Sequence, residues 1–444
     1  MTGTVELLSR VTKLMPRARA ELAELVAIRS VADAPSQECE RAAKWVCDAF
    51  AAEGFADALL VTTADGSQAV VGSRRCHDPA APTVLLYAHY DVRPPLDERA
   101  WHTPPFEMTE VDGRWYGRGT ADCKGNILAH LTALRALGDD IPVNLKVLVE
   151  EQGAGGLADF VRHNADLLRA DAILVCDTGN AEAGKPAVTV SLRGMVDVVV
   201  TVETLAAQLP AGMFGGPTPD ALTALVSMLA TLHDRDGNTT VAGLAGDQIW
   251  YGEPYPAGRF RTDAGMLPGV GIVGGAGVAD SLWARPALSI LGIDCPPVTG
   301  STAAIAPEAA ARLNLRIPPG TDVATAESAL TGHLRAAAPW GAQVSVRTEA
   351  TEAPFLASVD GPAYRAVGEA MREVYGTPVT MLGHGGSIPL CAVLADTYPD
   401  AEIILMGVEE PSTSVHAPNE SVDPGELVAM ATAEAVFLRR YPRV

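Results

Sequence analysis

The chain lacks long apolar segments, an excess of positive charge and closely spaced cysteine pairs, and each absence excludes a class of protein or site. No stretch of 18 uncharged apolar residues occurs, so we predict no membrane-spanning helix. Positive charge is scarce, because 33 Lys and Arg stand against 54 Asp and Glu, and the net charge of -21 argues against nucleic acid as a partner. The seven cysteines are an odd, scattered set without a CxxC pair, which excludes a disulfide framework and a cysteine-rich zinc site. The N-terminal segment is charged throughout and has no signal-type apolar core, so we expect a soluble cytoplasmic protein.

Short apolar runs rich in Val, Ile and Leu alternate with helical patterns in the first part of the chain. The sequence PTVLLYAHYD is followed by NILAHLTALRAL, VNLKVLVEE, GLADFVRHNADLL and DAILVCDT. Such alternation is typical of a parallel sheet covered by helices. We therefore predict an α/β fold, a three-layer domain with a mainly parallel sheet.

The pattern changes near residue 188 and returns near residue 355. Between these points the expected order is strand, helix, strand, strand, helix, strand, which predicts an inserted ferredoxin-like α+β domain. At 444 residues the chain is long enough for two domains. We predict a metal-binding catalytic domain over 1–187 and 355–444, and an inserted lid and dimerisation domain over 188–354.

Acidic and histidine residues follow the predicted strands directly. Ligands of parallel sheets collect at the carboxyl ends of strands. Oxygen and imidazole donors without cysteine suit zinc, manganese or cobalt in a catalytic site. A single such residue is usually a cap or turn residue, but carboxylates gathered at one sheet edge repel each other unless cations lie between them. The candidates are His89, Asp91, Asp122, Glu150, Glu151, Asp177 and His416.

Ten motifs follow one another over nearly the whole length of the chain: YAHYDVRPP, WHTPPFE, WYGRGTADCKG, VEEQGAG, VCDT, SLRG, GMFGG, NLRIPPG, GGSIP and HAPNE. In these motifs the chain resembles the di-zinc dipeptidase, aminoacylase and carboxypeptidase family, and within it the carnosinase-like dipeptidases. The resemblance implies two divalent metal ions. Zn²⁺ is the expected ion, and Mn²⁺ and Co²⁺ are the alternatives. His89 and Asp177 would hold one ion. Glu151 and His416 would hold the other, and Asp122 would bridge both.

The resemblance also implies the roles of the remaining strand-end carboxylates. Glu150 would stay unligated above a metal-bridging water and act as the general base, since a metal pair acidifies this water. Asp91 would accept the second N–H of His89 and fix its tautomer.

The resemblance also implies residues that bind the substrate. Arg316 would pair with a substrate carboxylate in a bidentate manner. The other candidates are His384, Gly385, Gly386 and Ser387 in GHGGSIP. Arg193 in SLRG is open to a structural and a functional interpretation alike.

Three positions depart from the pattern of the family. Pro210 stands where the inserted domain usually offers a histidine to the oxyanion, and proline cannot donate a hydrogen bond. Ala303 stands where an asparagine or threonine is common, and His384 replaces a glutamate suited to a free amino terminus. These changes predict retained metal chemistry with an altered substrate.

We expect a di-metal hydrolase that cleaves the amide bond of a dipeptide-like or N-acyl amino acid with a free carboxylate. The protein would be a homodimer through its inserted domain, without a membrane or nucleic-acid partner. Two alternatives keep the fold and the metals. One is a specialised biosynthetic amidase, lyase or amide-forming enzyme on an unusual acid, and the other is a catalytically silent metal-binding homologue.

Overall fold

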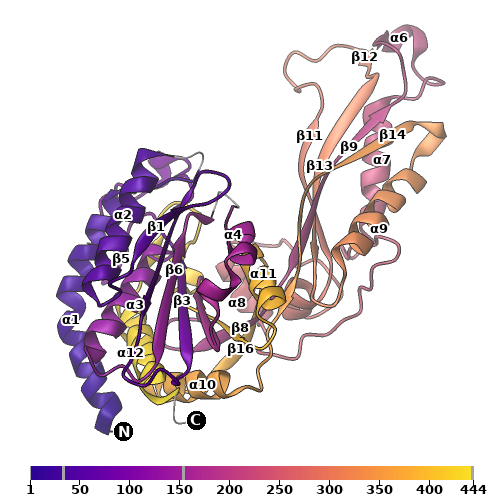
Figure 1. Cartoon of the computed structure of the whole chain (residues 1–444). Helices are drawn as coiled ribbons and strands as arrows, with labels where there is room; N and C mark the ends of the chain where they lie inside the picture. Colours follow the sequence, from indigo (N-terminus) through magenta and orange to yellow (C-terminus); the bar gives the residue numbers. More distant parts are fainter. Residues whose placement is uncertain (1, 33–35, 153–155, 442–444) are drawn as a thin grey trace. The chain divides into compact units, whose positions relative to one another are not determined.

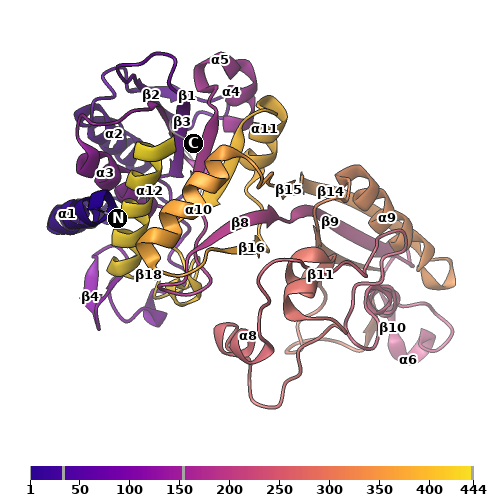
Figure 2. The ribbon, with the colours of Figure 1, turned by 90° about the horizontal axis from the view of Figure 1, so that it is seen from below.

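The computed structural model describes residues 2–32, 36–152 and 156–441, so residues 153–155 of the glycine-rich turn after Glu151 lie outside the described part. The chain forms two compact units, shown in Figures 1 and 2. The first unit contains residues 1–190, 357–382 and 390–444, and the second contains residues 191–356 and 383–389. None of the helices in the described segments is both long and apolar enough to cross a membrane.

The centre of the first unit is a sheet whose four middle strands, β6, β3, β7 and β17, run parallel in that order. Antiparallel strands flank them: β2 lies next to β6 with β1 on its other side, and β8 lies next to β17. Its interior strands are almost continuously apolar and buried, as expected where helices cover both faces. The strands of this unit and its edge are β1 (Leu59–Thr62), β2 (Gln68–Arg74), β3 (Thr83–His89), β6 (Asn144–Glu150), β7 (Ala172–Cys176), β8 (Ala187–Leu192), β16 (Thr380–His384) and β17 (Glu402–Met406). A small separate sheet contains β4 (Thr109–Val111), β5 (Arg114–Tyr116) and β18 (Ser421–Val422).

Helices lie on both sides of this sheet. Helices α1, α3 and α12 pack together, and α3 lies against β3. Figures 1 and 2 show α4, α5 and α11 on the opposite side, where the Tyr398 hydroxyl donates to the Ala165 carbonyl at 2.9 Å. The predicted three-layer α/β fold is therefore confirmed. The helices are α1 (Thr2–Ala27), α2 (Gln37–Ala52), α3 (Lys124–Leu137), α4 (Leu157–His163), α5 (Ala165–Leu168), α10 (Pro362–Tyr375), α11 (Pro389–Thr397) and α12 (Pro424–Arg440).

The second unit has an antiparallel sheet of order β11-β13-β9-β14. Along the chain its main elements follow as β9, α7, β11, β13, α9 and β14, so the spatial order is that of a ferredoxin-like fold. Its core joins the alternate valines of β9 to leucines of β13, α7 and α9. The elements are β9 (Gly194–Glu203), β10 (Leu209–Pro210), α6 (Ala211–Phe214), α7 (Ala221–Leu229), α8 (Ala257–Asp263), β11 (Ala287–Asp294), β12 (Ala304–Ile305), β13 (Glu308–Ile317), α9 (Val323–Ala336), β14 (Gln343–Glu352) and β15 (Phe355–Leu356).

The division of the chain differs in one respect from the predicted one. Residues 383–389, which carry the GHGGS motif, belong to the second unit, whereas the sequence pattern placed them with the catalytic domain. The reason is local, because Arg193 at the start of the second unit donates its backbone N–H to the His384 carbonyl at 3.3 Å.

Candidate active site

The candidate residues of the first unit come from the carboxyl ends of neighbouring strands. His89 ends β3, Glu150 ends the adjacent β6, and Asp177 directly follows β7. Because these strands are parallel, their carboxyl ends meet at one edge of the sheet. Tertiary structure thus brings together side chains that lie far apart in the sequence.

His89 is held from both ring nitrogens. Its Nδ1 lies 3.1 Å from Asp91 Oδ1, and its Nε2 lies 2.9 Å from Asp122 Oδ1 and 3.2 Å from Asp177 Oδ1. Burial disfavours the charged imidazole, but the neighbouring Cys123, Asp91 and Asp177 groups raise the pKa of His89 well above its usual value. The predicted orienting partner, Asp91, is therefore in place beside Nδ1.

Asp122 lies between two imidazoles. His89 Nε2 approaches one of its oxygens at 2.9 Å, and His416 Nε2 approaches the other at 2.8 Å. Burial alone would raise the pKa of Asp122, but the hydrogen bonds from His416 and His89 lower it well below the usual range. The loop that carries Asp122 is fixed by Glu420, whose Oε1 accepts the backbone N–H groups of Gly119 and Asp122 at 3.0 and 3.1 Å.

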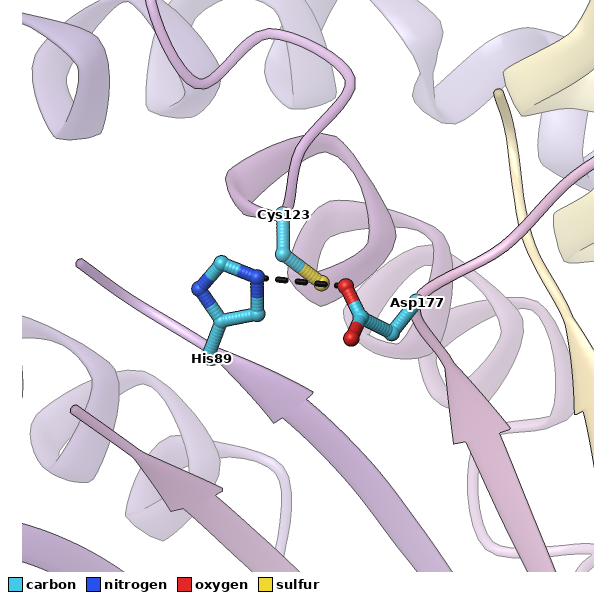
Figure 3. A group of neighbouring side chains, drawn as sticks. All are labelled: His89, Cys123 and Asp177. Atoms are coloured by element: carbon cyan, nitrogen blue, oxygen red, sulfur yellow. Dashed lines mark hydrogen bonds and ion pairs between the residues drawn. The ribbon is translucent and has the colours of Figure 1, made fainter. Parts of the chain in front are cut away.

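Asp177 faces the same space from β7. Figure 3 shows its carboxylate beside the His89 ring, with the Cys123 sulfur next to both. The Cys123 thiol donates to the Cys176 carbonyl at 2.9 Å, and the Gln152 amide donates to Asp177 Oδ2 at 2.7 Å.

Glu409, which was not among the residues predicted from the sequence, also lies in this group. Oxygens of Asp122, Asp177 and Glu409 all lie within 4.8 Å of one another. Burial and the charges of Asp122 and Asp177 raise the pKa of Glu409 well above its usual value. A signal was present, because Glu409 closely follows the apolar run of β17, as the other candidates follow their strands.

Glu150 is buried at the same sheet edge and is not one of the imidazole-bound carboxylates. The Tyr87 hydroxyl donates to its Oε1 at 2.6 Å. Burial raises the pKa of Glu150 to about 8, although the Tyr87 hydrogen bond acts in the opposite direction. A carboxyl group with a pKa in this range can exchange a proton near neutral pH.

Glu151 points elsewhere. Because adjacent side chains diverge at a strand end, its buried carboxylate lies beside Cys39 and Tyr90, while His416 contacts Asp122. Burial and the charge of Asp91 raise the pKa of Glu151. Thus His89, Asp122, Asp177 and His416 are joined by direct contacts in this structure, whereas Glu151 has a separate set of neighbours.

The donor chemistry of this group fits divalent metal ions. Each of the short contacts joins an imidazole nitrogen to a carboxylate oxygen, and these are the atoms that would coordinate zinc-type ions. Asp122 offers one oxygen to each side, as a bridging carboxylate requires.

The predicted substrate residues lie in the second unit. Arg316 Nη1 donates to Ser387 Oγ at 3.3 Å, and Ser387 in turn hydrogen-bonds Glu352. Arg193 donates from Nε to the Gly385 carbonyl at 3.3 Å, and burial together with the charge of Arg316 lowers the pKa of Arg193 to about 10.

The remaining residues of this motif form a tight local turn. The backbone N–H of Gly386 donates to His384 Nδ1 at 3.2 Å. The unit thus gathers two guanidinium groups and a hydroxyl, a set suited to a carboxylate.

Two of the replaced positions are also neighbours within the second unit. Pro210 in β10 pairs with Ala304 of β12, and the backbone N–H of Ala211 donates to the Ala303 carbonyl at 2.9 Å. Pro210 and Ala303 therefore belong to one small two-stranded structure, and neither side chain supplies a hydrogen-bond donor.

Comparison with known proteins assigns the chain to a peptidase family. The sequence model described as peptidase family M20/M25/M40 matches residues 85–440. A cysteinylglycine-S-conjugate dipeptidase of Corynebacterium striatum is 39% identical over 434 residues, covering 95% of this chain and 94% of the relative. A Cys-Gly metallodipeptidase of Schizosaccharomyces pombe is 28% identical over 373 residues, covering 78% and 77% of the two chains.

A solved structure supports the fold. The crystal structure of human carnosine dipeptidase 1 has a TM-score of 0.84 at 24% identity, covering 99% of each chain. Both units of the present chain thus have counterparts in that architecture.

Proposed function

Because the chain belongs to peptidase family M20/M25/M40, we propose that it hydrolyses dipeptides of the cysteinylglycine type in a metal-dependent reaction. The chain is a metal-dependent dipeptide hydrolase, and the alternatives of a biosynthetic enzyme or a silent homologue are not favoured. One observation carries the proposal at the level of the site: the Asp122 carboxylate lies between His89 and His416, as expected of a ligand that bridges two ions.

Two divalent ions would be held by residues of the first unit. We assign His89 and Asp177 to one ion, His416 and Glu151 to the other, and Asp122 to both. For Glu151 this assignment requires its side chain to turn from Cys39 and Tyr90 when the ion binds. Zinc suits the nitrogen and oxygen donors, with manganese or cobalt as alternatives. Bound ions would lower the pKa of a water molecule and polarise the scissile carbonyl.

The residues of the chain supply the proton transfer. We assign Glu150 as the general base, which takes a proton from the attacking water and delivers it to the leaving nitrogen. The Tyr87 hydroxyl holds the Glu150 carboxylate through its 2.6 Å hydrogen bond. Asp91 keeps the His89 ring oriented, so that Nε2 faces Asp122 and Asp177, which we assign to the same ion.

Substitution of Glu150 tests this mechanism. We expect Glu150→Gln to lower kcat by about 10²- to 10⁴-fold while bound metal, measured by elemental analysis, stays unchanged. The exposed Glu98 provides a matched control, and Glu98→Gln should retain full activity. Full turnover in Glu150→Gln would remove Glu150 from the mechanism.

In the second unit we propose that Arg316, with Ser387 and the turn of His384, Gly385 and Gly386, binds the substrate carboxylate. Support comes from the Arg316–Ser387 hydrogen bond, which places a guanidinium beside a hydroxyl. Arg316→Met should raise KM for a dipeptide more than for its C-terminal amide. An equal effect on both substrates would contradict this role.

We also propose that the second unit acts as a lid and forms a homodimer. Its edge strand β11 exposes Ile290, Leu291 and Ile293 at 42, 55 and 39%, and an exposed apolar sheet edge favours pairing with a second copy. Light scattering should give a dimer for the wild type and a monomer for Ile293→Lys. A monomeric wild type would refute the dimer.

Within the cell we propose a cytoplasmic location. All seven cysteines are unpaired, as expected in a reducing compartment. Recovery of the protein in a secreted fraction would contradict this assignment.

A further inference from the structure

We propose that Glu409 binds the positively charged amino group of the dipeptide substrate and so selects substrates with a free amino terminus. The inference rests on the proposed function, since it concerns the same site. It adds a binding residue that lies outside the metal-ligand set and the proton-transfer residues assigned above.

The backbone of Glu409 is fixed next to the loop of Asp177. Glu409 forms a parallel bridge with Gly179, and the Asn180 backbone N–H donates to its carbonyl at 2.8 Å. A Cβ on Gly179 would lie 1.9 Å from the Glu409 carbonyl oxygen, so only glycine permits this approach. The close contact holds Glu409 at the carboxyl edge of the sheet.

In the group of Asp122, Asp177 and Glu409, the Glu409 carboxylate differs from the other two in its hydrogen bonds. Asp122 accepts from two imidazoles, and Asp177 contacts His89 and the Gln152 amide. Among the residues that the structure describes, no side chain donates a hydrogen bond to the Glu409 carboxylate. A carboxylate held within 4.8 Å of two others takes up a proton more readily, and a positive group beside it would favour its charged form.

The proposed metal pair does not provide that compensation in full. Two divalent ions bring four positive charges, which the three ligand carboxylates and the Glu150 base already match in number, and Asp91 beside His89 adds a further carboxylate. An ionised Glu409 therefore increases an excess of negative charge. A substrate with one ammonium group near the metals would compensate Glu409.

The covalent geometry of an α-dipeptide places its ammonium group at the required position. Standard bond lengths and angles put the amino nitrogen about 2.5 Å from the scissile carbonyl carbon. When that carbonyl reaches the metal-binding residues, the ammonium group must lie beside them as well. Glu409 shares this space with Asp122 and Asp177, so a charge-assisted hydrogen bond between the ammonium group and its carboxylate is within reach.

The test compares two substrates that differ only at the amino group, S-methyl-cysteinylglycine and its N-acetyl derivative. In Glu409→Gln we expect kcat/KM for the free amine to fall about 10- to 100-fold, as for loss of a charge-assisted hydrogen bond. For the acetylated substrate, kcat/KM should fall less than threefold, which corresponds to at most about 0.7 kcal/mol. Glu150→Gln is the matched control, because it should depress both substrates to the same degree.

The metal content of the variant distinguishes an amine-binding Glu409 from a Glu409 that is a metal ligand. Elemental analysis of Glu409→Gln should find the same ions as in the wild type. Loss of an ion, or an equal fall for both substrates, would show that Glu409 is a metal ligand and would overturn the proposal, as would an unchanged substrate ratio. A wild type inactive on both substrates would instead refute the proposed function itself.

Discussion

The buried ion pair between Arg118 and Glu420 offers the sharpest test of how the site is supported. Arg118 Nη1 lies 2.6 Å from Glu420 Oε2, and the two side chains are 1% and 0% exposed. The other oxygen of Glu420 accepts the backbone N–H of Asp122, so the pair fixes the loop of the candidate bridging ligand. Glu420→Gln leaves the buried Arg118 charge without a carboxylate, and only neutral partners such as the Pro94 and His416 carbonyls remain.

The expected cost follows from the burial of both groups. Removing one member of a buried pair costs about 3–5 kcal/mol, because the remaining charge is not solvated. For a unit of about 270 residues, an unfolding entropy of about 2.1 cal/mol/K per residue converts this into a Tm shift of about 5–9 °C. Since glutamine has one acceptor oxygen for the groups that Glu420 serves with two, the Asp122 loop is held less firmly, and we also expect weaker metal binding.

Thermal and urea unfolding of the metal-free protein measure the effect without the contribution of bound ions. The exposed pair Lys44–Asp48, 69% and 65% exposed, is the matched control, and Lys44→Gln should leave the unfolding midpoint unchanged. The double variant Arg118→Met/Glu420→Gln should recover part of the loss, since it leaves no buried charge and keeps an oxygen for the backbone N–H groups of the Asp122 loop. A loss below about 1 kcal/mol in Glu420→Gln would refute the reasoning, because the buried arginine would then need no carboxylate.

Further predictions concern the base and the core of the second unit. Tyr87→Phe removes a charge-assisted hydrogen bond from the Glu150 carboxylate, so the acidic limb of the kcat/KM profile should move up by about 1–2 pH units at constant metal content; an unmoved limb would separate Tyr87 from the base. In the metal-free protein, burial raises the pKa of Glu150 from 4.5 to about 8, so the folded state holds a proton that the unfolded state releases in this range. Stability should therefore fall as pH rises from about 4.5 to about 8, by up to about 1.4 kcal/mol per pH unit relative to Glu150→Gln, and parallel stability curves in urea would contradict the shift. Leu313→Ala empties a fully buried position of the second unit and should cost about 2–5 kcal/mol in urea unfolding, where a loss below about 1 kcal/mol would mean that the core collapses around the cavity.

Much of the fold was predictable because it depends on local patterns. The apolar runs that end at His89, Cys176 and Glu150 are strands in the structure, and their alternation with helices predicted the parallel sheet. The inserted unit was likewise visible as a change of pattern. The membership of residues 383–389 in the second unit was not predictable in this way. It depends on the backbone hydrogen bond between Arg193 and His384, which lie far apart in the sequence.

The candidate site was predictable as a set of residues but not as an arrangement. Position at a strand end identified His89 and Asp177, whereas Asp122 lies in the turn before α3, and the structure brings all three into contact. The same criterion applied to Glu409, yet its sequence neighbours gave no sign that its side chain would face this group.

By itself, the sequence determined the order of strands and helices, the family and the positions where acidic and imidazole side chains follow strands. It could do so because side-chain periodicity and strand termination are properties of short segments. Only the tertiary structure decided which of the adjacent carboxylates meets Tyr87, which meets Cys39, and that Glu409 joins Asp122 and Asp177. These outcomes depend on the directions in which side chains leave separate strand ends, and those directions are set by packing between segments far apart in the chain.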